Sequence, residues 1–336
     1  MNVLLTCAGR RNYLIDYFRR ALGGRGRVFA ADHSDLAPAL QDADESFIVP
    51  VVCHRDYAEQ LLTICHQHHI GMIISLNDLE LPVLAAARKR FEQEGIIVVV
   101  SEPQVINVCY DKWETTAFAR KQGLAAPATY LSGAEARKAL AEGALKFPLV
   151  VKPRWGSASF ALEICEDEDE LTVALALTRK LLSKIVLPQE SHPDQEKNIL
   201  IQEKIEADEY HLDIVNDLRG RYACTLIKKK LAMRAGETDK AMTVDHPGLQ
   251  DMGERIGKGL GHVGNLDCDV MMNDRGAYLI DMNPRFGGGY PFSHTAGADI
   301  PAALLAWAEG RTPDASWLKV RPGVRAAKYD RLVLIR

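Results

Sequence analysis

Short apolar runs alternate with stretches of helical spacing through the first hundred residues, and this alternation constrains the fold more than any other feature of the chain. Strand-length apolar runs occupy residues 3–6, 28–31, 72–76 and 96–100. Between them, apolar side chains recur at helical spacing, as at Leu14 and Phe18. Because strands separated by helices pair in parallel, the pattern predicts a doubly wound parallel α/β domain.

Polar residues follow these strands at their carboxyl ends, where a doubly wound sheet binds its ligands. Arg10 and Arg11 precede a helix and could hold a carboxylate or a phosphate, although two solvated arginines on a surface loop fit the sequence equally well. Asp32 is expected to cap the turn that follows it. Glu80 is either a substrate contact or a solvated helix position, and the sequence leaves both open.

A nicotinamide-binding domain is the main rival interpretation of this segment. Its fingerprint requires three spaced glycines between the first strand and the first helix. Only Gly9 is present at that place. The sequence therefore disfavours a dehydrogenase.

The pattern changes near residue 110, where the chain becomes polar. A helix is expected from Lys112 to about Gly123, whose position suits a C-terminal cap. A small α/β lobe follows. Its expected elements are strands at residues 147–152 and 161–165 and a helix at residues 167–183.

The remainder of the chain is rich in strands. A helix at residues 249–260 interrupts them, which predicts an antiparallel sheet with one helix packed across it. The expected strands are residues 199–205, 210–216, 221–233, 266–272 and 277–282. The predicted fold class is therefore α/β followed by α+β.

The strongest chemical signal lies in the predicted strand that ends with Asp281 and Asn283. Asp267, on the preceding strand, is expected to face Asp281. Two carboxylates and an amide oxygen suit Mg²⁺, and Arg285 can hold a phosphate oxygen. Upstream, Lys152 ends a strand and leads into a loop of small residues, where a flap over phosphates would lie. The two segments together predict chemistry on a nucleoside triphosphate.

In order and together, these segments resemble the ATP-grasp superfamily. The resemblance is to single-unit proteins similar to one half of the carbamoyl phosphate synthase large subunit and to pyrrolysine-type amino acid ligases. It covers nearly the whole chain to about Trp307 and is most specific at residues 151–154 and 279–289. It implies an N-terminal α/β domain followed by two lobes that grip ATP. The corresponding domain ranges are 1–110, 111–198 and 199–336.

The resemblance also implies which residues would hold ATP. Two lysines would neutralise the α- and β-phosphates, and a glycine and a serine would belong to the flap that closes over them. A strand-end glutamate and the two backbone units after it would hold adenine, and a second glutamate would hold the ribose. In that order, these residues are Lys112, Lys152, Gly156, Ser157, Glu203, Lys204, Ile205 and Glu209.

By the same resemblance, Asp267, Asp281 and Asn283 would bind Mg²⁺, with Mn²⁺ as a further candidate. Arg285 would steady the transferring γ-phosphoryl group, and Lys152 would assist it. The sequence departs from the family in two places. The flap has fewer glycines than usual, and Asp281 stands where glutamate is common. Either departure could retune or weaken the enzyme.

The residues expected to contact substrates are less specific. Arg234 and Lys240 lie in a segment that is expected to follow a strand and precede a helix, and they could bind carboxylates or be plain exposed charges. Gly288, within three consecutive glycines, would let the backbone approach a phosphate or substrate closely. His294 is a candidate base, although a hydrogen-bonding prop is the stronger interpretation.

These features predict an ATP-dependent carboxylate–amine ligase that forms an amide through an acylphosphate, acting on an amino acid or a small carboxylic acid. Carbamoyl phosphate synthesis itself is not expected, because that large subunit carries two ATP-grasp units. An ATP-binding regulator or scaffold with degraded catalysis is the alternative, and the glycine-poor flap supports it.

The composition of the chain bears on its binding partners and its cellular location. The net charge of −4 over 336 residues offers no bulk attraction for nucleic acid. No apolar run approaches the roughly 18 residues of a membrane span, and no charged leader opens the chain, so a cytoplasmic protein is expected. The seven cysteines lie singly and are expected to be reduced thiols. The resemblance implies a homodimer through the N-terminal domain.

Overall fold

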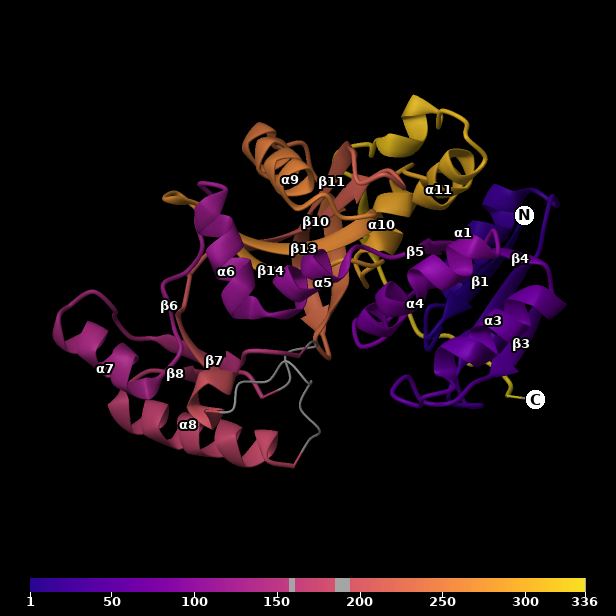
Figure 1. The fold of residues 1–336 in the computed structure, drawn as a ribbon. Coiled ribbons are helices and arrows are strands. Elements are labelled where there is room, and N and C mark those ends of the chain that lie inside the picture. The colour runs from indigo at the N-terminus through magenta and orange to yellow at the C-terminus, as the bar shows by residue number, and fades with distance from the viewer. Residues whose placement is uncertain (157–160, 185–193, 336) are drawn as a thin grey trace.

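The computed structural model describes residues 1–156, 161–184 and 194–335 of the chain. Three sheets organise it (Figure 1), with the N-terminal sheet at one end, the smallest sheet at the other and a large antiparallel sheet between them. Among the described residues, no helix combines the length and the apolar character that crossing a membrane would require.

The N-terminal sheet has the strand order β3-β2-β1-β4-β5, and its neighbouring strands pair in parallel. Four of its strands match the predicted apolar runs. The sequence missed β3 because its residues alternate between partly buried and exposed at the edge of the sheet. The five strands are β1 (Asn2–Thr6), β2 (Val28–Asp32), β3 (Glu45–Ile48), β4 (Ile70–Ser75) and β5 (Ile97–Val99).

Helices cover both faces of this sheet. Leu5 and Ala30 pack on one side with α1 and α11, whereas Leu4 and Phe29 pack on the other with α3 and α4. Because successive strand residues point to opposite faces, uninterrupted apolar runs are what a sheet buried on both sides requires. The N-terminal helices are α1 (Asn12–Leu22), α2 (Ala39–Asp42), α3 (Tyr57–Gln67) and α4 (Leu81–Gln93), and α11 is Ile300–Ala308.

Two helices, α5 (Pro103–Tyr110) and α6 (Lys112–Lys121), lead from this sheet to the rest of the chain. Asp111 caps α6 by accepting a hydrogen bond from the Trp113 backbone N–H at 3.0 Å. Gly123 adopts a left-handed φ of 65° just beyond the helix, as its predicted capping position requires.

The smallest sheet has the order β6-β9-β7-β8, and α7 and α8 cover one of its faces. The strand at residues 199–205 was expected in the C-terminal sheet, and this is wrong because β9 pairs antiparallel with β6 and β7. Pairing partners far apart in sequence leave no local signal. The elements are β6 (Thr129–Tyr130), α7 (Gly133–Ala141), β7 (Leu149–Pro153), β8 (Glu163–Cys165), α8 (Glu168–Leu182), the 3₁₀ helix η1 (Gln195–Asn198) and β9 (Ile199–Glu203).

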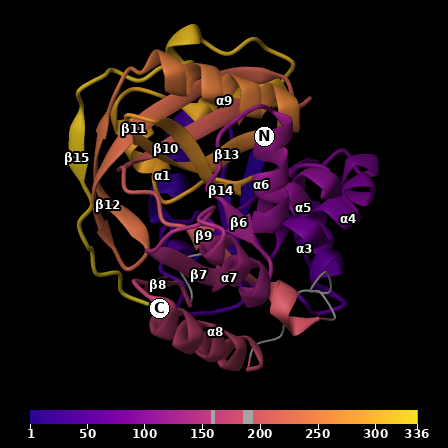
Figure 2. The same ribbon diagram turned by 90° about the vertical axis from the view of Figure 1, so that its left-hand side faces the viewer.

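The large sheet has the order β14-β13-β10-β11-β12-β15 and is antiparallel, with α9 packed across one face (Figure 2). The segment from Arg234 to Lys240 was expected to precede a helix, but it turns into β12 instead. The elements are β10 (Asp208–Asn216), β11 (Tyr222–Arg234), β12 (Glu237–Thr243), α9 (Pro247–Leu260), β13 (Gly264–Asn273), β14 (Gly276–Asn283), α10 (Tyr290–Thr295), the 3₁₀ helix η2 (Ala315–Leu318) and β15 (Arg325–Ala327).

Successive side chains of β10 point alternately to the apolar core and to the polar face of the large sheet. Leu212 and Ile214 face α9 and belong to the apolar core, whereas His211 and Asp213 point to the opposite face. The predicted fold class, parallel α/β followed by antiparallel α+β, is confirmed. The division at residues 110 and 198 stays a prediction.

Candidate active site

The β13–β14 hairpin carries four polar side chains on one face. In its register, Asp267 lies opposite Asn283, and Asp269 lies opposite Asp281. Asp267 and Asp281 were expected to lie opposite each other, and this is wrong because the register is shifted by two residues. The register of a hairpin depends on its turn and, here, on the bulge after Asp269. Asp269 was missed, although its spacing of two from Asp267 places both on the same face of a strand.

A cavity of about 250 Å³ opens above this hairpin. Three parts of the chain line it, namely the carboxyl edge of the N-terminal sheet, the large sheet and the glycine turn after β14. Its polar and glycine lining includes Arg11, Asn77, Asp78, His211, Lys230, Glu237, Asp267, Asp269, Asp281, Asn283, Arg285, Gly288 and Gly289.

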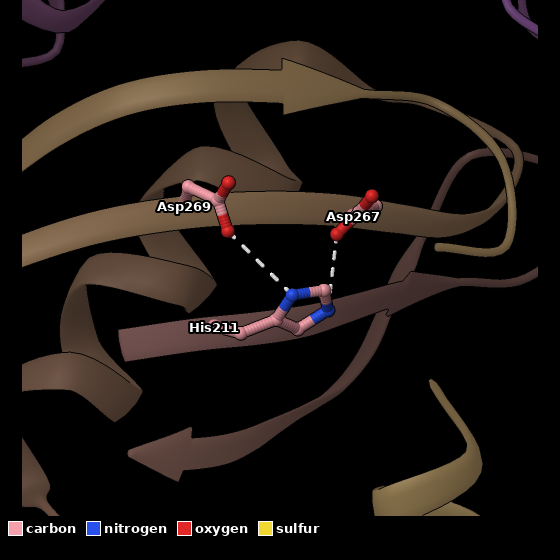
Figure 3. A group of neighbouring side chains, drawn as sticks. All are labelled: His211, Asp267 and Asp269. Atoms are coloured by element: carbon pink, nitrogen blue, oxygen red, sulfur yellow. Dashed lines mark ion pairs between the residues drawn. The ribbon is translucent and has the colours of Figure 1, made fainter. Parts of the chain in front are cut away.

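His211 stands between two carboxylates of this cavity (Figure 3). Its Nε2 lies 3.0 Å from Asp267 Oδ1 and its Nδ1 lies 3.5 Å from Asp269 Oδ1. Burial and nearby Lys228 disfavour the charged ring, but Asp267 and the hydrogen bond with Asp213 outweigh them and raise the pKa of His211 to about 10. The imidazolium therefore neutralises part of the acidic cluster. This histidine was not among the predicted site residues.

Arg285 is held by two carboxylates. Its Nη1 donates to Asp267 Oδ2 at 2.5 Å and its Nη2 donates to Asp78 Oδ2 at 2.8 Å. Burial works against the charged guanidinium, yet Asp78 and Asp267 raise the pKa of Arg285 above its usual range. Arg285 thus lies in the cavity as a charged group, beside Asp267, as the predicted phosphate contact requires.

The two lysines predicted to contact phosphates lie near Asp281 and come from separate elements. Lys112, at the start of α6, lies 3.1 Å from Asp281 Oδ1 and donates to the Gly156 carbonyl oxygen at 2.7 Å. Lys152, at the end of β7, donates to Gln202 Oε1 at 2.8 Å. Burial, together with the like charge of Lys112, lowers the pKa of Lys152 to about 8. Ser157, the other flap residue predicted, lies outside the residues that the structure describes.

The residues predicted for adenine and ribose have partners within the protein. Glu203 Oε2 accepts from the Ala128 backbone N–H at 3.3 Å, and the Lys204 N–H donates to the Pro148 carbonyl at 3.3 Å. Glu209 Oε1 accepts from Lys230 Nζ at 2.6 Å. Glu203, Lys204 and Ile205 lie at the end of β9, beside β7, and their nucleotide roles stay predictions.

The substrate residues predicted in the N-terminal domain do not lie in the cavity, although their sequence neighbours do. Arg10 is exposed and lies 3.5 Å from Asp330, whereas Arg11 lines the cavity and lies 3.3 Å from Glu237 Oε1. Glu80 is fully buried and accepts hydrogen bonds from Thr6, Tyr57 and Ser75, so its expected solvated position is wrong. It also does not line this cavity, unlike Asn77 and Asp78 on the same loop. Burial raises the pKa of Glu80.

Three further predicted substrate residues do not line this cavity. Arg234 pairs with Asp330 at 2.7 Å, and Lys240 lies in β12, where it pairs in register with Ala327. His294 stacks on Tyr17, with ring centroids 3.6 Å apart. Burial and nearby Arg20 lower the pKa of His294 to about 4, which fits a packed neutral ring.

The three glycines after Arg285 lie against site side chains. A Cβ on Gly287 would be 2.2 Å from Asp267 Cγ, and a Cβ on Gly289 would be 2.5 Å from His211 Cε1. At Gly288, which lines the cavity, a Cβ would be 3.1 Å from Glu237 Oε2. The close approach predicted for this turn is therefore made to protein side chains.

Two models of known protein families match parts of this chain. Residues 195–332 match the family model described as ATP-grasp in the biosynthetic pathway with Ter operon, and residues 3–99 match that of the PylC-like N-terminal domain. These two matches confirm the resemblance to the ATP-grasp superfamily that the sequence predicted.

Individual relatives are distant. The chain is 24% identical over 233 residues to the carbamoyl phosphate synthase large chain of Corynebacterium glutamicum, a match covering 66% of this chain and 20% of that relative. Biotin carboxylase from Campylobacter jejuni has a TM-score of 0.74 at 16% identity, covering 95% of this chain and 73% of that chain. L-amino acid ligase from Bacillus licheniformis has a TM-score of 0.68 at 16% identity, covering 96% and 77%. At these identities, the structural matches show a shared fold.

Proposed function

We propose that this protein is an ATP-dependent carboxylate–amine ligase. One observation carries the proposal: Lys112 of α6, Lys152 of β7 and Arg285 of the turn after β14 lie beside the hairpin that bears Asp267 and Asp281. A binding site for a triphosphate needs cations on several sides and hard oxygen donors for a metal ion between them. The superfamily supports the same reaction class.

The donor set fits a divalent cation. Three carboxylates and an amide face one end of the cavity, and oxygen donors of this kind suit Mg²⁺. Asp267, Asp281 and Asn283 would hold it, with Asp269 beside them, and Mn²⁺ would suit the same donors. When bound, the ion would neutralise charge on the phosphates.

The reaction balances as two substitutions. A carboxylate oxygen of the first substrate attacks the γ-phosphorus of ATP, the bond to the β-phosphate oxygen breaks, and ADP leaves with the bonding electrons. The lone pair of the second substrate's amine then attacks the acylphosphate carbonyl. Phosphate leaves, the nitrogen loses a proton, and an amide remains.

This chain's residues would serve both steps by alignment and charge. Lys112 and Lys152 would hold the phosphate chain, and Arg285 would stabilise the transferring phosphoryl group, where its contact gains most in the transition state. Arg11 and Asp78, at the carboxyl edge of the N-terminal sheet, would contact the substrates that enter from that side. A flap closing over the phosphates would exclude water from the acylphosphate.

A regulator or scaffold that binds ATP without turnover is the second candidate. Asp78 and Asp267 already neutralise the charge of Arg285 in the structure, so they would compete with a phosphate for it. A protein in which these carboxylates always win that competition would bind nucleotide and release no ADP.

The test is a screen for ADP formation with ATP, Mg²⁺ and pairs drawn from amino acids, small carboxylic acids and amines. A ligase forms ADP and phosphate in equal amounts only when a carboxylate is present, and hydroxylamine would trap the acylphosphate as a hydroxamate. ATP binding without ADP formation by any pair would favour the regulator. We also propose that the substrates are small molecules, that the protein does not bind nucleic acid and that it is cytoplasmic. We further propose that it forms a homodimer, which analytical ultracentrifugation would measure directly.

A further inference from the structure

The N-terminal sheet reverses its strand order next to the cavity. In the order β3-β2-β1-β4-β5, β2 lies on one side of β1 and β4 lies on the other. A doubly wound sheet binds ligands beyond the carboxyl ends of its strands at such a reversal. Arg11 follows β1 and Asp78 follows β4, and both side chains line the cavity. The cavity therefore reaches the place where this sheet is expected to hold a ligand.

Asp78 offers a carboxylate oxygen to this end of the cavity. Its Oδ2 accepts a hydrogen bond from Arg285 Nη2 at 2.8 Å. Its Oδ1 is buried and accepts no hydrogen bond from any residue that the structure describes. A buried anionic oxygen without a donor is unfavourable, because it has lost water and gained nothing in exchange. The Oδ1 atom therefore marks a position for a donor from a ligand, and an ammonium group suits a carboxylate best.

Arg11 offers the opposite kind of group. Its Nη1 lies 3.3 Å from Glu237 Oε1, whereas its Nε is buried and donates to no residue in the described part of the chain. Glu237 is half-exposed and also lies 3.1 Å from Lys328 Nζ through its Oε2. One carboxylate thus serves two cations, so these three groups keep an excess of positive charge. A carboxylate from a ligand would satisfy both the Arg11 Nε and that excess.

We propose that the acceptor substrate of this protein is an amino acid, whose carboxylate binds Arg11 and whose amine binds Asp78 Oδ1. The inference rests on the proposed ligase function and names the class of its second substrate. Two buried atoms of opposite character in one cavity require a ligand that carries both an acceptor and a donor. A free amino acid carries both, whereas a simple amine satisfies only Asp78 and a dicarboxylate satisfies only Arg11.

The other oxygen of Asp78 determines where the amine would react. It holds Arg285, the residue assigned to the transferring phosphoryl group, so an amine on Oδ1 would lie beside the acylphosphate formed there. The ammonium first releases a proton to water. Its nitrogen lone pair then attacks the acylphosphate carbonyl carbon, the bond from that carbon to the phosphate oxygen breaks, and phosphate leaves with the electrons. The nitrogen releases a second proton to water, and the product is an amide that keeps the carboxylate of the acceptor.

The experiment measures the binding of amino acids to the full chain by calorimetry, with Mg²⁺ and a non-hydrolysable ATP analogue present. The probes are the common amino acids of both hands and two analogues of each. The carboxamide lacks the carboxylate, and the 2-hydroxy acid lacks the amine. At least one amino acid should bind about tenfold more tightly than either analogue, because each analogue loses a charge-assisted hydrogen bond.

Single variants assign each half of the ligand. Arg11→Gln should weaken the amino acid about tenfold and leave its carboxamide within about twofold, because only the amino acid has a carboxylate to lose. Asp78→Asn should weaken the amino acid and leave the 2-hydroxy acid within about twofold for the corresponding reason. Arg11→Lys keeps the charge and should retain part of the preference for the amino acid. Arg10→Gln, at the exposed neighbouring arginine, is the matched control and should bind as wild type.

The outcomes separate this inference from the proposed function. An amino acid that binds wild type no better than its two analogues would overturn the inference, and this comparison holds even where a variant does not fold. Equal losses for the amino acid and its carboxamide in Arg11→Gln would also overturn it. ADP formation with other amines, without amino acid binding, would leave the ligase and remove the amino acid. The expected binding pattern without ADP formation by any pair would refute the ligase and leave the amino acid site.

Discussion

Arg285 lies 2.8 Å from Asp78. This ion pair joins the turn after the β13–β14 hairpin to the loop that follows β4 of the N-terminal sheet. The same guanidinium also contacts Asp267. One side chain therefore connects the predicted metal site with the edge at which a parallel sheet binds its ligands. In the proposed ATP complex, both carboxylates would compete with phosphate for the charge of Arg285.

Replacing Arg285 by alanine should remove most turnover, by about a hundredfold or more, while ATP affinity stays within about tenfold, because its phosphate contact would strengthen in the transition state. Steady-state ADP formation and direct ATP binding are the two measurements. Arg25→Ala, which removes an exposed arginine paired with Glu309, serves as the control and should behave as wild type. Full activity in Arg285→Ala would refute the assigned role.

Gly289→Ala should destabilise the fold by about 1–3 kcal/mol, because the new methyl group would overlap the buried His211 ring. Gly289 has an ordinary φ of −82°, so the effect is steric and not a matter of backbone strain. Gly288→Ala should cost less, since the Glu237 carboxylate it approaches ends a flexible side chain. Urea unfolding measures both. Equal stability of the two variants would contradict this account of the turn.

The affinity for ATP should fall as the pH rises through about 8, the lowered pKa of Lys152. The protonated lysine binds phosphate, so above this pH the free protein must first take up a proton, and affinity falls by at most about tenfold per pH unit. Titrations at pH 7, 8 and 9 give the measurement. Lys152→Arg stays charged and should show a flatter profile. A wild-type affinity that is constant across this range would exclude Lys152 as a phosphate ligand.

Stability should fall as the pH drops from about 6.5 to about 4, in part because of His262. Burial lowers the pKa of this histidine to about 4, while its Nε2 lies 2.9 Å from the Ile214 carbonyl oxygen. Between these two pH values the unfolded chain binds a proton that the folded chain does not, which lowers stability by up to about 3 kcal/mol.

The difference between wild type and His262→Gln isolates this contribution, because other groups titrate equally in both proteins. The variant should lose less stability between pH 6.5 and pH 4 in urea unfolding. His66→Gln, at an exposed position in α3, should keep the wild-type slope. Parallel pH profiles for wild type and His262→Gln would show that the buried ring does not contribute.

Local pattern was sufficient to predict most of the long helices and strands and the Asp281–Arg285 motif. Apolar runs predicted four of the five parallel strands, since burial on both faces leaves a continuous signal. The spacing of Asp281, Asn283 and Arg285 predicted an acidic hairpin beside an arginine, and the structure has one. The phosphate roles of Lys112 and Lys152 came from the family resemblance, and they stay predictions.

Long-range partners were beyond local pattern. Glu80 looks like a surface helix residue in sequence, yet it is buried because Thr6, Tyr57 and Ser75 converge on it from three other places in the chain. His211 lies far from Asp267 in sequence and reaches it only across paired strands. His294 was a candidate base, but it packs on Tyr17 of the first helix.

The amino-acid sequence by itself determined the types and order of most elements and the chemical character of the hairpin, because periodicity and residue type are local properties. Only the tertiary structure decided that Asp269 lies opposite Asp281, that β9 belongs to the smallest sheet, and that Asp78 holds Arg285. Strand register and contacts between distant segments depend on how the whole chain packs, and no short stretch of residues encodes them.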